Sequence, residues 1–201
     1  MLTGVRKLDG FLDRAAQGRV LAAVRAGMAA APPFRPEMPR TGKPFSVRMT
    51  NLGPLGWVSD RAGGYRYQPT HPVTGEPWPP IPEAILAVWR EVARYPHDPE
   101  ACLVNLYGSG ARMGLHQDRD EETFDAPVVS ISLGDRARFR VGGTERKGPT
   151  ASFWLDSGDV LVLEGAARLA FHGIDRVVPD SSTLCPDLGR VNLTLRRVTR
   201  P

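Results

Sequence analysis

The chain has 201 residues and a formal net charge of +4, with 41% hydrophobic and 24% charged residues. That length is enough for one domain, residues 1–201, with a buried core that needs no disulfide or structural metal. No apolar run approaches the ~20 residues needed to cross a membrane, and charged residues interrupt the first segment where a secretory signal would be apolar. These features predict a cytoplasmic protein with no membrane partner.

Two cysteines are present, Cys102 within an apolar run and Cys185 beside Pro186. Their positions match no metal-binding or disulfide pattern. We interpret them as reduced thiols of a cytosolic protein, with a single disulfide as the alternative.

The first hundred residues predict two helices and one strand. Residues 1–16 are mixed and irregular. An alanine-rich stretch then carries apolar residues at helical spacing and ends before Pro32; these residues are Val20, Leu21, Val24 and Met28. Residues 45–50 alternate as a strand does. Pro82 suits a first helical turn, and an apolar stripe follows it through Val92.

Residues 52–80 are rich in glycine and proline and are expected to be loop-like. A loop of this length in a compact domain usually carries function or forms a lid. Between Arg40 and Thr70 only Asp60 is acidic, and five bases are interleaved with Trp57, Tyr65 and Tyr67. A second basic run lies between residues 135 and 147. Such segments suit phosphate contact with bases stacked on aromatic rings, although a solvated basic loop fits the charge pattern equally well.

Two further histidines, His71 and His97, lie in loops flanked by proline. Neither has a carboxylate at ligand spacing that the rest of the chain supports as a metal site. We therefore expect both to be surface residues.

From residue 101 the pattern changes to short strands separated by turns. The expected strands are 101–107, 113–118, 127–133, 137–142, 151–155, 159–163, 168–173 and 190–198. Two helices followed by about eight short strands indicate an α+β protein whose body is a double-sheet jelly roll.

His116 and Asp118 are two residues apart, so in an extended segment both side chains leave the same face. A distant second histidine, His172, would complete two imidazoles and one carboxylate. That arrangement leaves one side of an octahedral metal open and suits non-haem Fe(II), which must also bind a co-substrate and O2. The spacing His-x-Asp alone is common by chance.

The strand 190–196 has one polar and one apolar face, because polar residues alternate with Val191, Leu193 and Leu195. An ordinary half-exposed strand would show the same alternation. Two arginines that frame an amide and a hydroxyl nevertheless suit a small dicarboxylate, which planar guanidinium groups hold bidentately. The polar face consists of Arg190, Asn192, Thr194 and Arg196. Asn105 and Tyr107 share one face of another strand in the same way.

Taken together, these residues resemble the AlkB family of nucleic-acid repair dioxygenases, which use Fe(II) and 2-oxoglutarate. The resemblance covers about residues 45–198. The motifs that carry it are Leu55-Gly56-Trp57, Gly64-Tyr65-Arg66-Tyr67, Asn105-x-Tyr107, Leu115-His116-Gln117-Asp118-x-Asp120, Ser130-x-Ser132-Leu133-Gly134, Gly158-Asp159-Val160, His172-Gly173-Ile174 and Arg190-x-Asn192-Leu193-Thr194-x-Arg196.

The resemblance implies a role for each site residue. The iron ligands would be His116, Asp118 and His172. The distal carboxylate of 2-oxoglutarate would be held by Asn105, Tyr107 and Arg190, with Asn192 between the two ends and Arg196 near the metal. The substrate contacts would be Trp57, stacked on the damaged base opposite His116, Asp120, facing its exocyclic nitrogen, and Tyr65 and Arg146, near the strand backbone or the base.

The family also implies a fold and an activity. The expected fold is a double-stranded β-helix at about residues 101–198, with N-terminal helices and a nucleotide-recognition lid at about residues 40–80. The expected activity is oxidative demethylation of 1-methyladenine- and 3-methylcytosine-type bases in DNA, with release of formaldehyde. Fe(II) is the expected metal, 2-oxoglutarate and O2 are the co-substrates, and the partner is alkylated, preferably single-stranded, DNA bound by a monomer.

Two alternatives remain open. The same chemistry could act on RNA, or on an N-methyl group of a protein or small molecule, and a less favoured alternative is a lesion-binding protein without turnover. One departure from the family also stands out: Leu163 occupies a position where the bacterial member has tryptophan. Because that position lines the co-substrate end of the site in the family, co-substrate packing or O2 access is expected to differ. The roles of Arg61 and Arg66, beside a one-residue lengthening, stay open.

Overall fold

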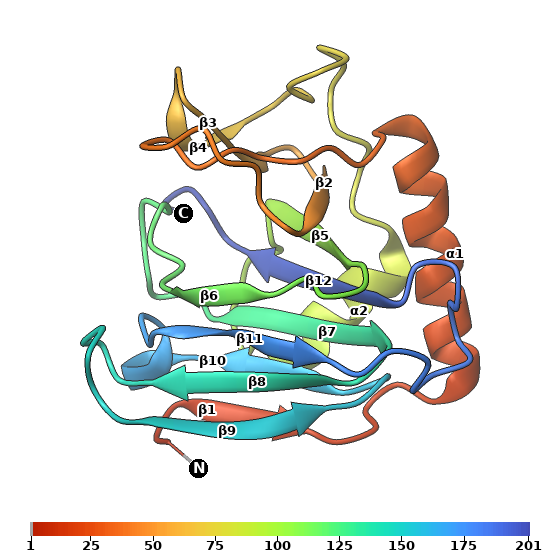
Figure 1. The fold of residues 1–201 in the computed structure, drawn as a ribbon, viewed down its shortest axis with the longest axis vertical. Coiled ribbons are helices and arrows are strands. Elements are labelled where there is room, and N and C mark those ends of the chain that lie inside the picture. Colours follow the sequence, from red (N-terminus) through yellow and green to blue (C-terminus); the bar gives the residue numbers. More distant parts are fainter. Residues whose placement is uncertain (1) are drawn as a thin grey trace.

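The computed structural model describes residues 2–201, and its strands form two main antiparallel sheets and a separate hairpin (Figure 1). In hydrogen-bonded order the large sheet contains β1 (Val5–Leu8), β10 (Val160–Leu163), β7 (Val128–Gly134), β12 (Arg190–Arg196), β5 (Ala101–Tyr107) and β2 (Arg48–Leu52). The smaller sheet contains β6 (Met113–His116), β11 (His172–Val177), β8 (Ala137–Gly142) and β9 (Thr150–Leu155). The hairpin pairs β3 (Gly56–Asp60) with β4 (Gly64–Gln68).

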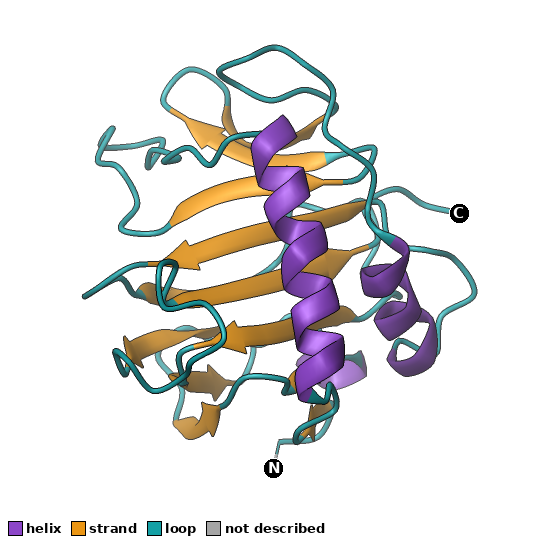
Figure 2. Ribbon diagram, turned by 90° about the vertical axis from the view of Figure 1, so that its right-hand side faces the viewer, coloured by secondary structure: helices purple, strands orange, loops and turns teal. Residues whose placement is uncertain are grey.

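Two helices cover the outer face of the large sheet (Figure 2). Helix α1 (Arg14–Ala30) begins where the Asp13 carboxylate accepts a hydrogen bond from the Ala16 N–H, a typical N-cap. Helix α2 (Glu83–Val92) buries an apolar stripe that includes Trp89. Within residues 2–201, no helix is long and apolar enough to span a bilayer.

The two sheets bury a second apolar layer between them. From the large sheet this layer takes Leu103, Leu161 and Leu163, and from the smaller sheet Phe139 and Val141. Each strand sends alternate side chains into the layer, which is why the apolar residues along β8 recur every second position. Helices on one face and two facing antiparallel sheets confirm the predicted α+β jelly roll.

The predicted helices and seven of the eight strands predicted from residue 101 onward are present with small shifts in their bounds. Other predicted boundaries are wrong. Residues 52–80 are not all loop, since they contain the β3–β4 hairpin, whose glycines hid the alternation. The irregular start contains β1, which covers the edge of β10. The strand expected at 45–50 is β2, at 48–52. The strand expected at 168–173 is replaced by the 3-10 turn η1 (Gly165–Ala167) and by β11, which starts at His172.

The expectation that His71 lies on the surface is wrong, because its side chain is buried. Its Nε2 lies 2.8 Å from the Pro32 carbonyl oxygen, and its Nδ1 accepts hydrogen bonds from the N–H groups of Val73 and Thr74. The turn closes around the ring, which packs against Trp78. A local turn of this kind leaves no signal in the spacing of residues. His97 is exposed, as expected.

Both cysteines are free and buried, so the disulfide alternative is wrong. Burial raises the pKa of Cys102 to about 12, which keeps the group protonated at neutral pH. Neither thiol is therefore placed for reaction or metal binding.

We predict opposite effects for two glycine substitutions. Gly134 has φ of +79°, and an added Cβ would overlap the Gly189 carbonyl oxygen, so Gly134→Ala should lower the free energy of unfolding by about 1–3 kcal/mol. Gly18 lies inside α1 with open space around it, so Gly18→Ala should raise that free energy by about 0.5–1 kcal/mol. Urea denaturation of the two variants beside the wild type measures both changes. Equal stability of all three proteins would contradict the prediction.

Candidate active site

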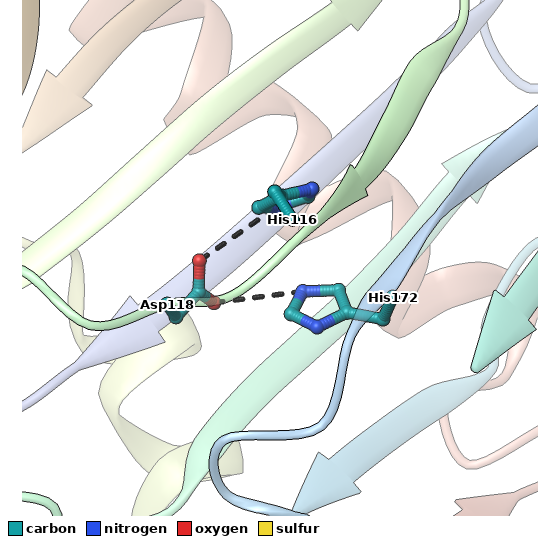
Figure 3. A group of neighbouring side chains, drawn as sticks. All are labelled: His116, Asp118 and His172. Carbon is teal, nitrogen blue, oxygen red and sulfur yellow. Dashed lines mark ion pairs between the residues drawn. The ribbon is translucent and has the colours of Figure 1, made fainter. Parts of the chain in front are cut away.

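Three potential metal ligands lie close together at the β6 edge of the smaller sheet. His116 ends β6, Asp118 follows two residues later, and His172 begins β11, where it pairs directly with His116. One ligand atom from each residue lies within 4.8 Å of the others. Figure 3 shows the three side chains pointing toward one another, with 3.7 Å from each imidazole Nε2 to an oxygen of Asp118.

Hydrogen bonding fixes which nitrogen of each imidazole is free. His116 Nδ1 lies 2.9 Å from the Gly114 carbonyl oxygen, and His172 Nδ1 lies 2.9 Å from the Ala170 carbonyl oxygen. Because a carbonyl oxygen only accepts, both Nδ1 atoms carry the proton and both Nε2 lone pairs face the cluster. Burial, together with His116, lowers the pKa of His172 to about 4, so its imidazole is neutral at pH 7.

The carboxylate of Asp118 is ready to bind a cation. Arg196 donates from Nη2 to Asp118 Oδ1 at 2.8 Å, whereas the buried Oδ2 has no hydrogen-bond partner. Burial raises the pKa of Asp118, but the guanidinium of Arg196 and the two imidazoles lower it by more, and the group stays ionised. An unpartnered buried oxygen beside two imidazole lone pairs fits a divalent metal with two nitrogen ligands and one oxygen ligand.

Arg190 is a buried cation without a counter-ion. Its side chain is fully buried; Nη1 donates to the Asp135 carbonyl oxygen, Nη2 donates to Ser132 Oγ, and Nε has no partner. Among the described residues 2–201, both of its hydrogen-bond partners are neutral oxygens and neither is a carboxylate. Burial lowers the pKa of Arg190 to about 10, so the group is still charged at pH 7. Because an unpaired buried charge is costly, this site favours an anionic ligand.

A row of polar side chains joins Arg190 to the metal cluster. Tyr107 pairs with Arg190 across β5 and β12, and Asn105 pairs with Asn192 in the same way. Asn105 donates from Nδ2 to Asn192 Oδ1 at 3.3 Å, and its own Oδ1 has no partner. Arg196, at the end of the row, is neutralised by Asp118. The polar face of β12 thus runs from a cation without a carboxylate partner to a paired cation beside the cluster.

On the other side of the cluster, the hairpin supplies an aromatic stack. The ring of Trp57 lies 5.6 Å from that of Tyr65, nearly parallel to it, and Phe45 meets Trp57 edge-on. Trp57 Nε1 donates to Asp120 Oδ2 at 2.8 Å. The indole and the carboxylate are therefore held together at the entrance to the cluster.

All the residues predicted for the site line a single cavity of about 800 Å³. They are Trp57, Tyr65, Asn105, Tyr107, His116, Asp118, Asp120, Arg146, His172, Arg190, Asn192 and Arg196. Leu163 also lines this cavity and is almost fully buried. The structure therefore brings the whole predicted set together around one space, and none of these residues lies elsewhere.

A buried network at the wall of this cavity was not predicted from the sequence. Glu121 accepts hydrogen bonds from the Tyr67 hydroxyl at 2.5 Å and from Arg168 Nη2 at 3.2 Å. Arg168 also donates to the Asp118 carbonyl oxygen, so it supports the metal-cluster segment from behind. Burial raises the pKa of Tyr67 well above its usual value. The isolated charge of Arg168 in an alanine-rich run was a usable signal, but nothing separated Glu121 from the neighbouring solvated acids.

Comparison with known proteins agrees with this geometry. A family model described as the 2OG-Fe(II) oxygenase superfamily matches residues 4–196. An alpha-ketoglutarate-dependent dioxygenase AlkB homolog of Caulobacter vibrioides (strain NA1000 / CB15N) is 57% identical over 188 residues, which cover 94% of this chain and 84% of that protein. AlkB of Escherichia coli (strain K12) is 43% identical over 169 residues, covering 82% and 77%. The solved structure of OsALKBH1 aligns with a TM-score of 0.80 and 32% identity over 98% of each chain.

We predict that His116→Ala weakens divalent metal binding by more than about 10–100-fold, the loss typical of outer-shell changes at metal sites. The fold should survive because the His116 side chain is 40% exposed. Binding of Mn(II), followed by its electron paramagnetic resonance signal, measures the change. His97→Ala, which removes an exposed histidine elsewhere, is the matched control. Unchanged affinity in His116→Ala would contradict the ligand assignment.

Proposed function

The chain belongs to the 2OG-Fe(II) oxygenase superfamily, and we propose that it repairs DNA by oxidative removal of N-methyl groups from adenine and cytosine. The observation that carries this proposal is that one cavity holds the metal cluster, an anion-ready polar row and an aromatic stack with a carboxylate. A lesion-binding protein without turnover would need neither the metal cluster nor the polar row.

His116, Asp118 and His172 would hold Fe(II) through two Nε2 atoms and one carboxylate oxygen. When bound, Fe(II) with 2-oxoglutarate and O2 supplies the oxidising power that converts an N-methyl group to N-hydroxymethyl, while 2-oxoglutarate becomes succinate and CO2. The hydroxymethyl group leaves the base as formaldehyde. The protein contributes binding, orientation and exclusion of water, and the oxidation belongs to the cofactor.

For 2-oxoglutarate, we propose that Arg190 and Tyr107 bind the carboxylate distant from the metal. The unpartnered Nε of Arg190 and its lack of a carboxylate partner support this role. Asn105 and Asn192 would line the middle of the molecule, and Arg196 would lie at its metal end. Leu163 gives this end of the cavity an aliphatic wall.

For the base, we propose stacking on Trp57 and recognition by Asp120. Since Asp120 Oδ2 already accepts the indole N–H, Oδ1 is left to accept from an exocyclic amine. Adenine and cytosine carry such an amine, and methylation at the pairing edge makes them cationic, which a carboxylate favours. Tyr65, which is 52% exposed, and Arg146 would contact the strand next to the target.

Single-stranded DNA is the preferred substrate in this proposal. The methyl group lies on the pairing edge, so the base must leave the stack before the cavity can receive it. Residues of about 40–80, which include the β3–β4 hairpin, would act as the nucleotide-recognition lid of one domain spanning 1–201, over a jelly-roll core of about 101–198. Their bases and aromatic rings support contact with a strand.

We also propose that the protein works as a monomer in the cytoplasm. The proposed site needs no second subunit, because every residue predicted for it lies in this chain. The two free, buried thiols suit a reducing compartment.

Formaldehyde release tests the proposed activity. The protein, supplied with Fe(II), 2-oxoglutarate and O2, should release formaldehyde from single-stranded DNA that contains 1-methyladenine or 3-methylcytosine, and matched RNA should compete less well. No formaldehyde from folded, iron-loaded protein would overturn the repair function.

Arg190→Met should raise the KM for 2-oxoglutarate, because a charge-assisted carboxylate bond is worth about 1.5–3 kcal/mol.

Asp120→Asn tests base recognition. It keeps the side-chain volume but removes the charge that faces the cationic base, so kcat/KM for 1-methyladenine should fall about tenfold or more, in line with the worth of a charged hydrogen bond. The KM for 2-oxoglutarate should stay the same. Asp125→Asn, an exposed acid of the same loop, is the control. An equal loss in both variants would contradict the role of Asp120.

A further inference from the structure

The face of the smaller sheet that points away from the cavity carries a cluster of arginines. Along β8, Ala137, Phe139 and Val141 point into the core, so Arg138 and Arg140 point outward. Arg176 on β11 pairs with Arg138, and Trp154 on β9 pairs with Arg138 from the other side. We call the set the outer arginine face; it consists of Arg136, Arg138, Arg140, Arg176, Ser152 and Trp154.

Trp154 holds two of these arginines in place. The guanidinium carbon of Arg136 lies 5.1 Å from the centre of the indole ring, and that of Arg176 lies 5.3 Å from it. Arg138 donates from Nε and Nη2 to Ser152 Oγ. These contacts order long side chains that would otherwise lose rotamer freedom on binding an anion, so the face is preorganised.

The charges of this face do not cancel. Arg136 pairs with Asp156 and Arg140 with Asp175, which are the acids that face the cluster. In residues 2–201, Arg138 and Arg176 form no ion pair, and both are exposed. Two ordered guanidinium groups are therefore free to meet phosphate.

The turn between β8 and β9 joins the mouth of the cavity to the outer arginine face along the chain. Arg146, in the turn between β8 and β9, lines the cavity and lies over the ring of Phe171. Thr150, where β9 begins, accepts from Arg140 Nη2 and so starts the outer face. Along β8, Arg138 and Arg140 occupy every second position, on the face of the smaller sheet that points away from the cavity.

We propose that the outer arginine face binds the sugar-phosphate backbone of the nucleic-acid strand whose target base occupies the cavity. This inference rests on the proposed function and adds a second contact, remote from the reacting base. The six residues of β8 span about 20 Å at roughly 3.4 Å each. A strand must extend several nucleotides beyond the target to reach Arg138 and Arg176, so the contact favours long substrates over short ones.

Fluorescence anisotropy with unmethylated oligothymidine tests this proposal independently of turnover. A single strand of 20 nucleotides and one of three are titrated against the full, metal-loaded chain over a range of salt concentrations. The variant Arg138→Gln/Arg176→Gln should weaken binding of the 20-mer and reduce the slope of log K against log salt by about 1.4, because each lost phosphate contact on a single strand contributes about 0.7. The trinucleotide serves as the reference for each protein.

Two further variants separate a local contact from overall charge. Arg14→Gln/Arg19→Gln removes the same charge from the exposed side of α1 and should keep the wild-type slope. Arg138→Lys/Arg176→Lys keeps the charge and should restore most of the slope. An unchanged slope in Arg138→Gln/Arg176→Gln, or an equal fall in the α1 variant, would overturn the proposal.

The same variants also separate this inference from its alternatives. Weaker binding only to phosphatidylserine-containing vesicles, with oligothymidine unaffected, would assign the face to a lipid surface and overturn the nucleic-acid contact. If the wild type releases formaldehyde but its preference for the 20-mer survives in the Gln variant, the repair function stands and the outer contact fails. If no formaldehyde is released, the repair function fails whatever the anisotropy shows.

Discussion

The ion pair between Asp118 and Arg196 is the contact on which the site depends. It lies in the interior, where two charges taken from water are stable only if each is neutralised and hydrogen-bonded. Arg196 comes from β12 at the centre of the large sheet, and Asp118 follows β6 of the smaller sheet, so the pair links the two layers. It also holds one carboxylate oxygen, Oδ1, against the guanidinium and leaves the other, Oδ2, for a metal. Loss of either partner would leave an uncompensated charge in the core.

Arg190 and Arg196, six residues apart on one strand, have opposite environments. Arg196 is neutralised by the protein, and its pKa lies above the usual value because Asp118 outweighs the cost of burial. Arg190 is surrounded by neutral acceptors and an aromatic ring, and burial lowers its pKa. The two guanidinium groups therefore differ in their partners: that of Arg196 bonds to the Asp118 carboxylate, and that of Arg190 keeps an unpartnered Nε. This difference along a single strand is the reason for proposing that β12 orients a small diacid.

Local periodicity allowed much of this site to be predicted from the sequence. The two-residue spacing of His116 and Asp118 and the alternation of 190–196 are properties of an extended chain, so they needed no knowledge of topology. Pairing between distant strands is different: nothing in the sequence shows that His172 stands opposite His116. The roles of His71 and Glu121 were also hidden, because a buried polar group is recognised by partners that only the fold supplies. The glycines of the β3–β4 hairpin masked its strands in the same way.

The position of β12 also affects how the protein folds. In the large sheet β12 is hydrogen-bonded on both sides, to β5 and to β7, and it carries both arginines of the diacid row. A nascent chain that has not yet released residues 190–196 therefore has a sheet split down its middle, with two unpaired strand edges. Such non-local pairing slows folding and exposes edges that aggregate. The three potential metal ligands all precede β12, whereas Arg190 and Arg196 lie on it, so a partly synthesised chain would lack the side chains that we propose to orient the co-substrate.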